Sequence, residues 1–214
     1  MKITTALEQV VDAALHVVAP GYARERTEQP KHEVLIDEEP FQLRRYAPQL
    51  VASVTVTGDR DDATDKAFGQ LAGFIFAKDR EGEEIDMTTP VTQAVRGNDP
   101  MVTMSGAGTA AGRYTVRFIM PAKWTEETLP RPSNPDIAIE MLPAREMAVA
   151  TFSGRATDKA VREHGDKLRE FMEQHGLVAD GTVEYAYYDP PFTPPPARRN
   201  EVMMGVAERV GAAG

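Results

Sequence analysis

The 214-residue chain contains no cysteine. This absence excludes disulfide bonds, thiolate catalysis, and zinc or iron–sulfur sites built on cysteine ligands. Basic residues are in the minority, with 24 Lys and Arg against 33 Asp and Glu, a formal charge of −9 and a pI near 5.0. Because phosphate binding needs a cationic surface, we expect no nucleic-acid partner. A chain without cysteine is typical of the reducing cytosol, so we expect a cytoplasmic protein.

The sequence also lacks a long uninterrupted apolar run. The first twenty residues are rich in Val, Leu and Ala, but Glu8, Asp12 and His16 interrupt them. Their apolar positions recur at helical spacing, which predicts an amphipathic helix ending at Pro20 and no membrane insertion. This helix could pack on the body of the protein or on a second copy, so a homodimer through residues 1–20 is one hypothesis. We assign residues 1–32 to this helix and a polar linker.

No HExxH, GxSxG, P-loop or strand-linked GxGxxG motif is present. Of the four histidines, His164 alone falls on the inner stripe of a predicted helix, which makes it a weak candidate metal ligand or base. Glu201 follows two arginines and enters an apolar strand. An ion pair with Arg198 or Arg199 is the simpler interpretation of Glu201, and an acid lining a pocket is the alternative. Glu184 is the other carboxylate that a pocket could use.

The hydrophobic pattern changes period along the chain in the same order twice. Alternation with period two predicts strands at 33–36, 41–46, 50–57, 84–96 and 113–120, and again at 136–142, 146–154, 182–188 and 200–206. Period 3.6 predicts helices over 59–79 and 157–176, the second one capped by Thr157 and closed by Gly176. TDKAFGQLAGF and TDKAVREHGDKL occupy matching places, so an internal duplication is predicted. We expect an α+β fold with repeats over 33–120 and 136–206 and a flexible tail over 207–214.

The segment YYDPPFTPPPARRNEVMMGV joins the last two predicted strands. Proline cannot donate to a strand ladder, so the chain must leave the sheet here and re-enter it at Asn200. Two interpretations remain open, a stiff structural connector and the rim of a ligand pocket.

Three motifs in this order resemble those of the SOUL/heme-binding-protein family: FQLRRYAPQLVASVTV, IDMTTPVTQAV and YDPPFTPPPARRNEVMM. The resemblance covers residues 33–206. It implies a duplicated βαββ-type sheet that forms a distorted barrel with two flanking helices, related to gyrase-inhibitor-like small-molecule-binding domains.

The resemblance also implies reversible binding of heme, porphyrin or another flat apolar molecule in a shallow groove beside the first helix of the domain. The implied cofactor-binding positions are Phe68, Leu71, Ala72, Ile75, Arg45, Tyr46, Phe192 and Thr193. Arg45 stands where some members carry a histidine ligand, and Thr193 stands where others carry a basic residue. These departures predict weak porphyrin binding rather than tight hexacoordinate heme, in a binding protein rather than an enzyme. The alternatives are a small-molecule hydrolase of the gyrase-inhibitor-like type using Glu201 or Glu184, and a protein-interaction module.

Overall fold

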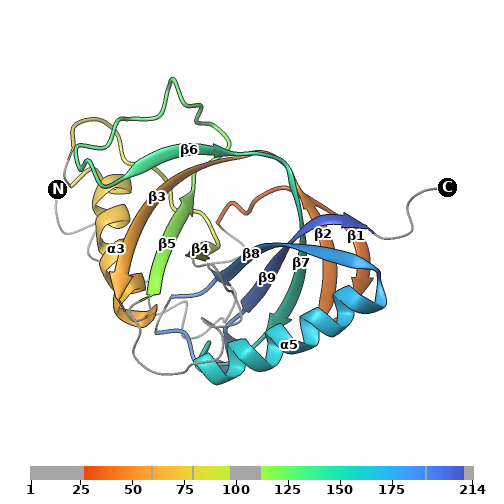
Figure 1. Cartoon of the computed structure of the whole chain (residues 1–214). Helices are drawn as coiled ribbons and strands as arrows, with labels where there is room; N and C mark the ends of the chain where they lie inside the picture. Colours follow the sequence, from red (N-terminus) through yellow and green to blue (C-terminus); the bar gives the residue numbers. More distant parts are fainter. Residues whose placement is uncertain (1–26, 59, 79, 97–111, 191, 210–214) are drawn as a thin grey trace.

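The computed structural model describes residues 27–58, 60–78, 80–96, 112–190 and 192–209 (Figure 1). The first half of the domain contains the strands β1 (His32–Glu38), β2 (Phe41–Tyr46), β3 (Gln49–Gly58), β4 (Val91–Arg96) and β5 (Gly112–Ile119), with helix α3 (Arg60–Ile75) after β3. The second half contains β6 (Ala138–Leu142), β7 (Arg145–Phe152), β8 (Leu177–Tyr187) and β9 (Asn200–Arg209), with helix α5 (Asp158–Gln174) after β7 and a 3-10 turn at Pro195–Ala197. The α+β class is therefore confirmed. The helix predicted for residues 1–20 lies outside the described residues.

The nine strands within the described residues belong to one antiparallel sheet with the order β1-β2-β7-β9-β8-β4-β5-β3-β6. The two βαββ units, β3-α3-β4-β5 and β7-α5-β8-β9, meet at the β4–β8 pair in the middle of the sheet. The strand that precedes each unit pairs with the other unit, since β2 lies beside β7 and β6 lies beside β3. The predicted duplication is thus present, with its first strands exchanged. The sheet is strongly curved but open, with β1 and β6 at its edges, so it does not form a closed barrel (Figure 1).

The two helices cover opposite halves of one face of the sheet (Figure 1). Leu71, Phe74 and Ile75 of α3 pack with β3 and β5, and Val161, Leu168 and Phe171 of α5 pack with β7, β8 and β9. The N-terminus of α5 is capped by Thr157, whose hydroxyl accepts a hydrogen bond from the Ala160 amide at 3.2 Å. After the helix, Gly176 takes a positive φ of 63°, as a closing glycine does. Both predicted ends of this helix are confirmed.

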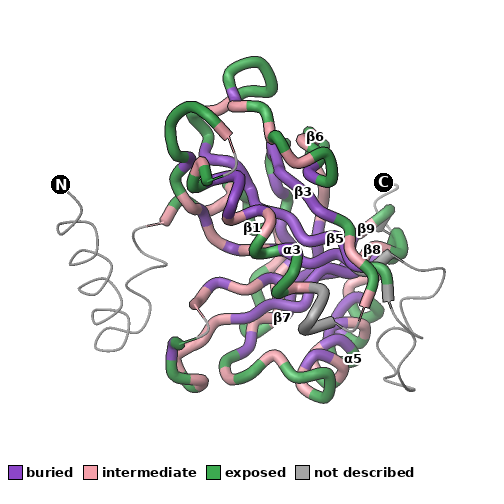
Figure 2. Tube along the Cα trace, turned by 90° about the vertical axis from the view of Figure 1, so that its left-hand side faces the viewer, coloured by how far each residue is buried: buried purple, intermediate pink, exposed green. Residues whose placement is uncertain are grey.

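The opposite face of the sheet is buried as well, but its composition is different. A third apolar cluster of Tyr46, Met147, Val149, Ala186, Tyr188 and Met203 lies there, and buried Arg and Glu side chains lie beside it. Buried residues therefore run along the middle of most strands, while exposed residues concentrate in turns and helices (Figure 2). Buried charges need partners of opposite charge, and the arginine and glutamate side chains on this face pair with one another.

Several segments differ from the predicted boundaries. β8 begins at Leu177 rather than at 182, α3 ends at Ile75 rather than at 79, and β9 continues to Arg209, so the tail predicted as flexible over 207–214 is wrong for its first three residues. The strand predicted for 84–96 begins only at Val91, because Pro90 has no N–H to donate to the ladder. Residues 27–31, assigned to the linker, are bonded to the body and are called here the N-terminal strap. The Glu28 carbonyl accepts from Thr89 N at 3.0 Å, its carboxylate accepts from Ala122 N at 2.8 Å, and the Lys31 carbonyl accepts from Ala47 N at 3.1 Å.

Candidate functional site

Helix α3 carries an apolar stripe on its solvent side as well as on its buried side. Phe68 and Phe76 are each 38% exposed, and Ala72 between them is half-buried. The spacing of four residues places all three side chains on the same side of the helix. Phe76 lies one residue past the end of α3, but its amide still donates a helical hydrogen bond to Ala72 O at 3.0 Å. Neighbouring Gly69 is also exposed and has no side chain, so the stripe has a flat flank. These residues are called the α3 stripe.

Helix α5 provides an internal comparison, because it occupies the equivalent place in the second half. Aligned by burial, positions 67, 71 and 74 of α3 match positions 161, 165 and 168 of α5, an offset of 94, which is one residue more than the offset of 93 between the two TDKA segments. The α3 stripe then corresponds to Arg162, Asp166 and Glu170. An ordinary solvent-facing helix surface is charged, as it is on α5, whereas the same surface of α3 is apolar. The stripe is therefore not a requirement of the fold.

The strands beside α3 extend this apolar surface toward the middle of the sheet. The Phe68 ring packs edge-on against Phe118 of β5, with 5.2 Å between ring centroids. Phe118 pairs with Val91 of β4, and Val91 pairs with Tyr187 of β8. Val91 and Tyr187 are only half-buried. The proline-rich segment starts directly after β8, and its Phe192 is 53% exposed.

The structure separates the predicted cofactor-binding residues of α3 into two groups. Leu71 and Ile75 are fully buried against β3 and β5, where they fill the core. Phe68 and Ala72 retain accessible surface. The helical period explains the separation, since Phe68 lies one residue, or about 100°, from the buried Ala67.

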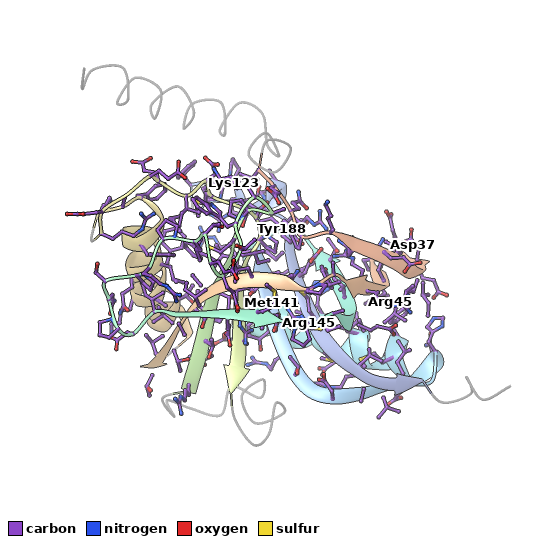
Figure 3. The ribbon with its side chains drawn as sticks, turned by 90° about the horizontal axis from the view of Figure 1, so that it is seen from above. Asp37, Arg45, Lys123, Met141, Arg145 and Tyr188 are labelled. Carbon is purple, nitrogen blue, oxygen red and sulfur yellow. The ribbon has the colours of Figure 1, made fainter. Side chains whose placement is uncertain are left out.

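Arg45 and Tyr46 lie on β2, in the other half of the sheet. Arg45 is at the opposite end of the molecule from α3 (Figure 3), where it pairs with Glu146 at 2.8 Å and Glu33 at 3.1 Å. Tyr46 is buried on the face of the sheet that carries no helix, and its ring lies 5.1 Å from that of His32 at a tilt of 45°. Thr193 is buried in the proline-rich segment, where its amide donates to Pro190 O at 3.0 Å. The strand pairs Phe118–Val91 and Val91–Tyr187 connect the neighbourhood of Phe68 to the end of β8, whereas Arg45 and Tyr46 lie on β2, three strands beyond β8.

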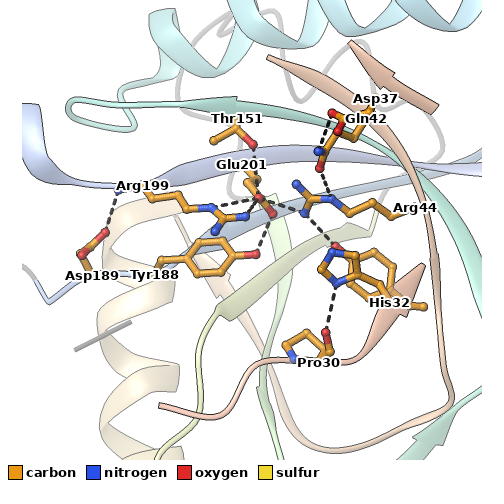
Figure 4. Close-up of polar contacts among 11 residues, drawn as sticks. Pro30, His32, Asp37, Gln42, Arg44, Thr151, Tyr188, Asp189, Arg199 and Glu201 are labelled. Carbon is orange, nitrogen blue, oxygen red and sulfur yellow. Dashed lines mark hydrogen bonds and ion pairs between the residues drawn. The ribbon is translucent and has the colours of Figure 1, made fainter. Parts of the chain in front are cut away.

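Glu201 lies at the centre of a hydrogen-bonded cluster on the buried helix-free face (Figure 4). Its side chain accepts from Arg44 Nη1 at 3.0 Å, Arg199 Nη2 at 2.6 Å, the Tyr188 hydroxyl at 2.8 Å and the Thr151 hydroxyl at 3.3 Å. The Arg199 guanidinium also stacks over the Tyr188 ring at 4.3 Å. Arg199 was predicted as a partner of Glu201 and is confirmed. Arg198 is not one, because its Nε donates to the Thr193 carbonyl at 2.7 Å.

The surroundings of Glu201 shift its own pKa and that of Tyr188. Burial by itself raises the pKa of Glu201, but Arg44 and Arg199 outweigh it, so the carboxyl pKa is below its usual value. Burial, and then the nearby Glu201 charge, raises the pKa of Tyr188 well above 10. Glu201 is therefore held as a carboxylate. An acid or base catalyst needs a pKa near the working pH, so this arrangement indicates a structural ion pair.

Glu184 is held in a second, similar cluster. It forms a bidentate pair with Arg145, at 2.6 and 3.0 Å, and accepts from Arg117 Nη1 at 2.9 Å. Arg117 belongs to β5 in the first unit, and Arg145 belongs to β7 in the second. Glu184 therefore connects the two units across the β4–β8 pair. Arg44, Arg117 and Arg145 come from β2, β5 and β7, far in sequence from the carboxylates that they meet, so no local sequence signal could have paired them. Arg199, directly before β9, is the exception, because it lies two residues from Glu201.

His164 lies on α5, over the half of the sheet that α3 does not cover (Figure 1). Its ring stacks on Phe152 with 4.3 Å between centroids, and its Nδ1 is buried without a hydrogen-bond partner. Burial, followed by the nearby Lys167, lowers the pKa of His164. Among the described residues, no group of three or more His, Asp or Glu side chains could hold a metal ion. The same part of the chain contains no helix both long and apolar enough to span a bilayer.

The fold resembles that of solved proteins with very different sequences. The C-terminal domain of EcmrR aligns with a TM-score of 0.60 at 13% identity, covering 79% of this chain and 98% of that chain. A hydrolase from Listeria innocua aligns with a TM-score of 0.54 at 14% identity, covering 87% of this chain and 98% of that one. At this identity the likeness defines the fold class alone, a duplicated sheet of the gyrase-inhibitor-like type.

Sequence comparison identifies the family. The family model for SOUL heme-binding proteins matches residues 27–205, and the chain belongs to this family. Heme-binding protein 2 of Mus musculus is 28% identical over 182 residues, which cover 82% of this chain and 84% of that protein. Heme-binding protein 1 of Mus musculus is 26% identical over 175 residues, covering 81% and 85% respectively. The matched range begins at the first residue of the N-terminal strap.

Proposed function

We propose that this protein binds heme, porphyrin or another flat apolar molecule reversibly against the α3 stripe. The observation that carries the proposal is the replacement of Arg162, Asp166 and Glu170 of α5 by Phe68, Ala72 and Phe76 at the equivalent places of α3. Exposed aromatic residues in line provide a surface for stacking a planar macrocycle. Membership of the SOUL heme-binding family, and the names of its two mouse relatives, support a tetrapyrrole as the ligand.

The ring system, rather than the iron, carries the affinity in this proposal. His164 on α5 lies over the other half of the sheet. Arg45 pairs with Glu33 and Glu146, far from α3. We therefore expect hemin and iron-free protoporphyrin IX to bind with affinities within about threefold of each other. A protein that ligates iron would instead prefer hemin strongly.

The test is a titration of the full-length protein with hemin and protoporphyrin IX, followed by their absorption bands. Replacing Phe68 or Phe76 by Ser removes apolar contact area, and we expect each change to weaken both ligands about tenfold. Val34→Ser is the matched control, because Val34 is also exposed, at 42%, but lies on the edge strand β1. No saturable change with wild-type protein at micromolar ligand would refute the proposal, and equal losses with Val34→Ser would refute the location.

The hydrolase alternative has a separate test. A catalytic role for Glu201 or Glu184 requires turnover that Glu201→Gln or Glu184→Gln abolishes while tetrapyrrole binding persists. The pairing of both carboxylates with two arginines each favours the binding protein.

A further inference from the structure

The two edge strands of the open sheet differ in how their edges are protected. β1 pairs only with β2, and β6 pairs only with β3. Proteins commonly block an exposed edge strand with charges or a bulge, because such an edge can pair with another chain. β1 has both, since its register shifts between Val34 and Ile36 and its acidic residues are exposed. β6, with the sequence AIEML, has an unbroken register and one charge, so its edge lacks this protection (Figure 1).

The backbone groups of Ile139 and Met141 point away from the sheet. The Leu50 carbonyl of β3 accepts the Met120 amide at 2.8 Å, on the β5 side of the strand. Leu50 therefore does not bond to Met141, the residue opposite it on β6, and by the alternation of an antiparallel ladder Ala52 does not bond to Ile139. The N–H and C=O groups of Ile139 and Met141 face the open edge, and no residue in the described part of the chain bonds to them.

The side chains of β6 leave an apolar residue at this edge. Ile139 and Met141 lie on the helix side of the sheet, because the β3 residues opposite them belong to the core under α3. Met141 is 48% exposed. Glu140, the one charged residue of the strand, points to the helix-free side, where it lies 3.6 Å from Arg117 Nε. On its helix side the edge thus presents an exposed methionine and no charge.

We propose that two copies of the chain pair through β6 in an antiparallel arrangement that continues the sheet from one copy into the other. An edge strand complements itself across a two-fold axis, because its outward N–H groups meet the outward C=O groups of an identical strand. Charge selects the register. With Glu140 on the axis, two carboxylates would lie on strands about 4.5 Å apart, which is unfavourable. With Met141 on the axis, Glu140 lies opposite Leu142 of the second copy, and the two exposed methionine side chains meet.

The short contact limits the strength of this dimer. A pairing of five-residue strands falls among small interfaces, below about 1,200 Å², which are typical of weak association. We expect a Kd on the order of 100 µM. At the micromolar concentrations of the hemin titration the protein is then a monomer, so the dimer and the tetrapyrrole site are tested separately.

Sedimentation equilibrium of the full chain from about 5 µM to 1 mM tests the association. The apparent mass should rise from 23.5 kDa toward twice that value. Met141→Lys places two ammonium groups opposite each other and should weaken the dimer at least tenfold. Val34→Lys, at a position 42% exposed on the other edge strand, is the matched control and should associate as wild type does. A constant mass up to about 1 mM, or equal association of Met141→Lys and wild type, would overturn the proposal.

A mixture of two variants tests the register. Met141→Lys and Met141→Glu should each be monomeric alone, but their mixture should associate, because opposite charges then meet on the axis. Failure of the mixture to associate would overturn the register with Met141 on the axis. A dimer formed through residues 1–20 would show neither the loss in the single variants nor the recovery in the mixture.

Amide hydrogen exchange locates the contact independently of the variants. The amides of Ile139 and Met141 face the open edge in the monomer and the second copy in the dimer, so their exchange should slow at least threefold between about 10 µM and 1 mM protein. The amides of Glu140 and Leu142 point toward β3 and should be protected equally at both concentrations. Unchanged exchange of Ile139 and Met141 in a sample whose mass has risen would place the dimer contact elsewhere and overturn the pairing through β6.

Discussion

Arg44 and Glu201 are 157 positions apart in the sequence, yet Nη1 of one lies 3.0 Å from Oε1 of the other in a buried ion pair. Arg44 reaches Glu201 across β7, since the sheet order is β2-β7-β9. Arg199 and Tyr188 complete the coordination of the carboxylate. The pair therefore connects an early strand, the proline-rich connector and the last strand on the face of the sheet that has no helix.

Replacing Glu201 by Gln should destabilise the protein by about 3–5 kcal/mol, because it leaves Arg44 and Arg199 without their counter-charge in a buried site. Urea unfolding followed by circular dichroism measures this as a lower midpoint at constant slope. Arg45→Gln is the matched control. Its exposed pairs with Glu33 and Glu146 contribute little, so its midpoint should not change. Equal midpoints for Glu201→Gln and wild type would contradict a structural role for the cluster.

The same cluster predicts acid sensitivity. The pKa of Glu201 is lower in the folded state than in the unfolded chain, so the unfolded state binds a proton first as the pH falls. The stability that Glu201 contributes is complete above about pH 5 and is lost as the pH falls through the folded pKa. Unfolding free energies measured from about pH 7 to pH 3 should therefore fall less steeply for Glu201→Gln than for wild type. Parallel curves would show that other carboxylates carry the acid sensitivity.

Replacing His164 by Phe should stabilise the protein, and more at acidic pH. The variant keeps the stack on Phe152 and removes the buried, unpaired Nδ1. The His164 pKa is lowered on folding, so the wild type loses stability as the pH falls through the unfolded value of about 6.5, and a phenyl ring does not. Thermal melts at about pH 8 and pH 5.5 should show a difference that widens toward pH 5.5. Hemin affinity should not change, and a large loss would identify His164 as a ligand.

The cap of α5 gives a prediction confined to one hydrogen bond. Thr157→Ala removes the acceptor of the Ala160 amide and should cost about 1 kcal/mol. Thr157→Ser keeps the hydroxyl and should lie close to wild type in the same urea titration. A loss of equal size in both variants would assign the effect to the threonine methyl group instead.

Two truncations separate the N-terminal strap from the residues before it. Removing residues 1–31 deletes the bonds to Thr89, Ala122 and Ala47, so we expect a lower melting temperature. Removing only residues 1–26 keeps these bonds and should preserve the melting temperature. Light scattering on the shorter truncation tests the predicted dimer through residues 1–20, since a halved mass would support it and an unchanged mass would refute it.

Most of the elements could be predicted because their signals are local. Alternation in LVASVTVT, the stripe of α5 and the caps at Thr157 and Gly176 reflect hydrogen bonds and side-chain directions within a few residues. The internal duplication and the three family motifs were also visible in the sequence. Of the two interpretations of the proline-rich segment, the structure supports the stiff connector, since the chain re-enters the sheet at Asn200 and Arg199 pairs with Glu201 at the re-entry.

What the sequence determined by itself was the type and order of the elements, the family and an acidic, cysteine-free composition. Tertiary structure alone decided that β2 and β6 exchange units and that the sheet stays open. It also decided that Leu71 and Ile75 fill the core while Phe68 retains exposed surface, and that Arg44 and Glu201 meet. The physical reason is that pairing between distant strands and the division of a helix surface depend on which faces the whole sheet covers. Residue spacing defines faces, but only packing determines what each face contacts.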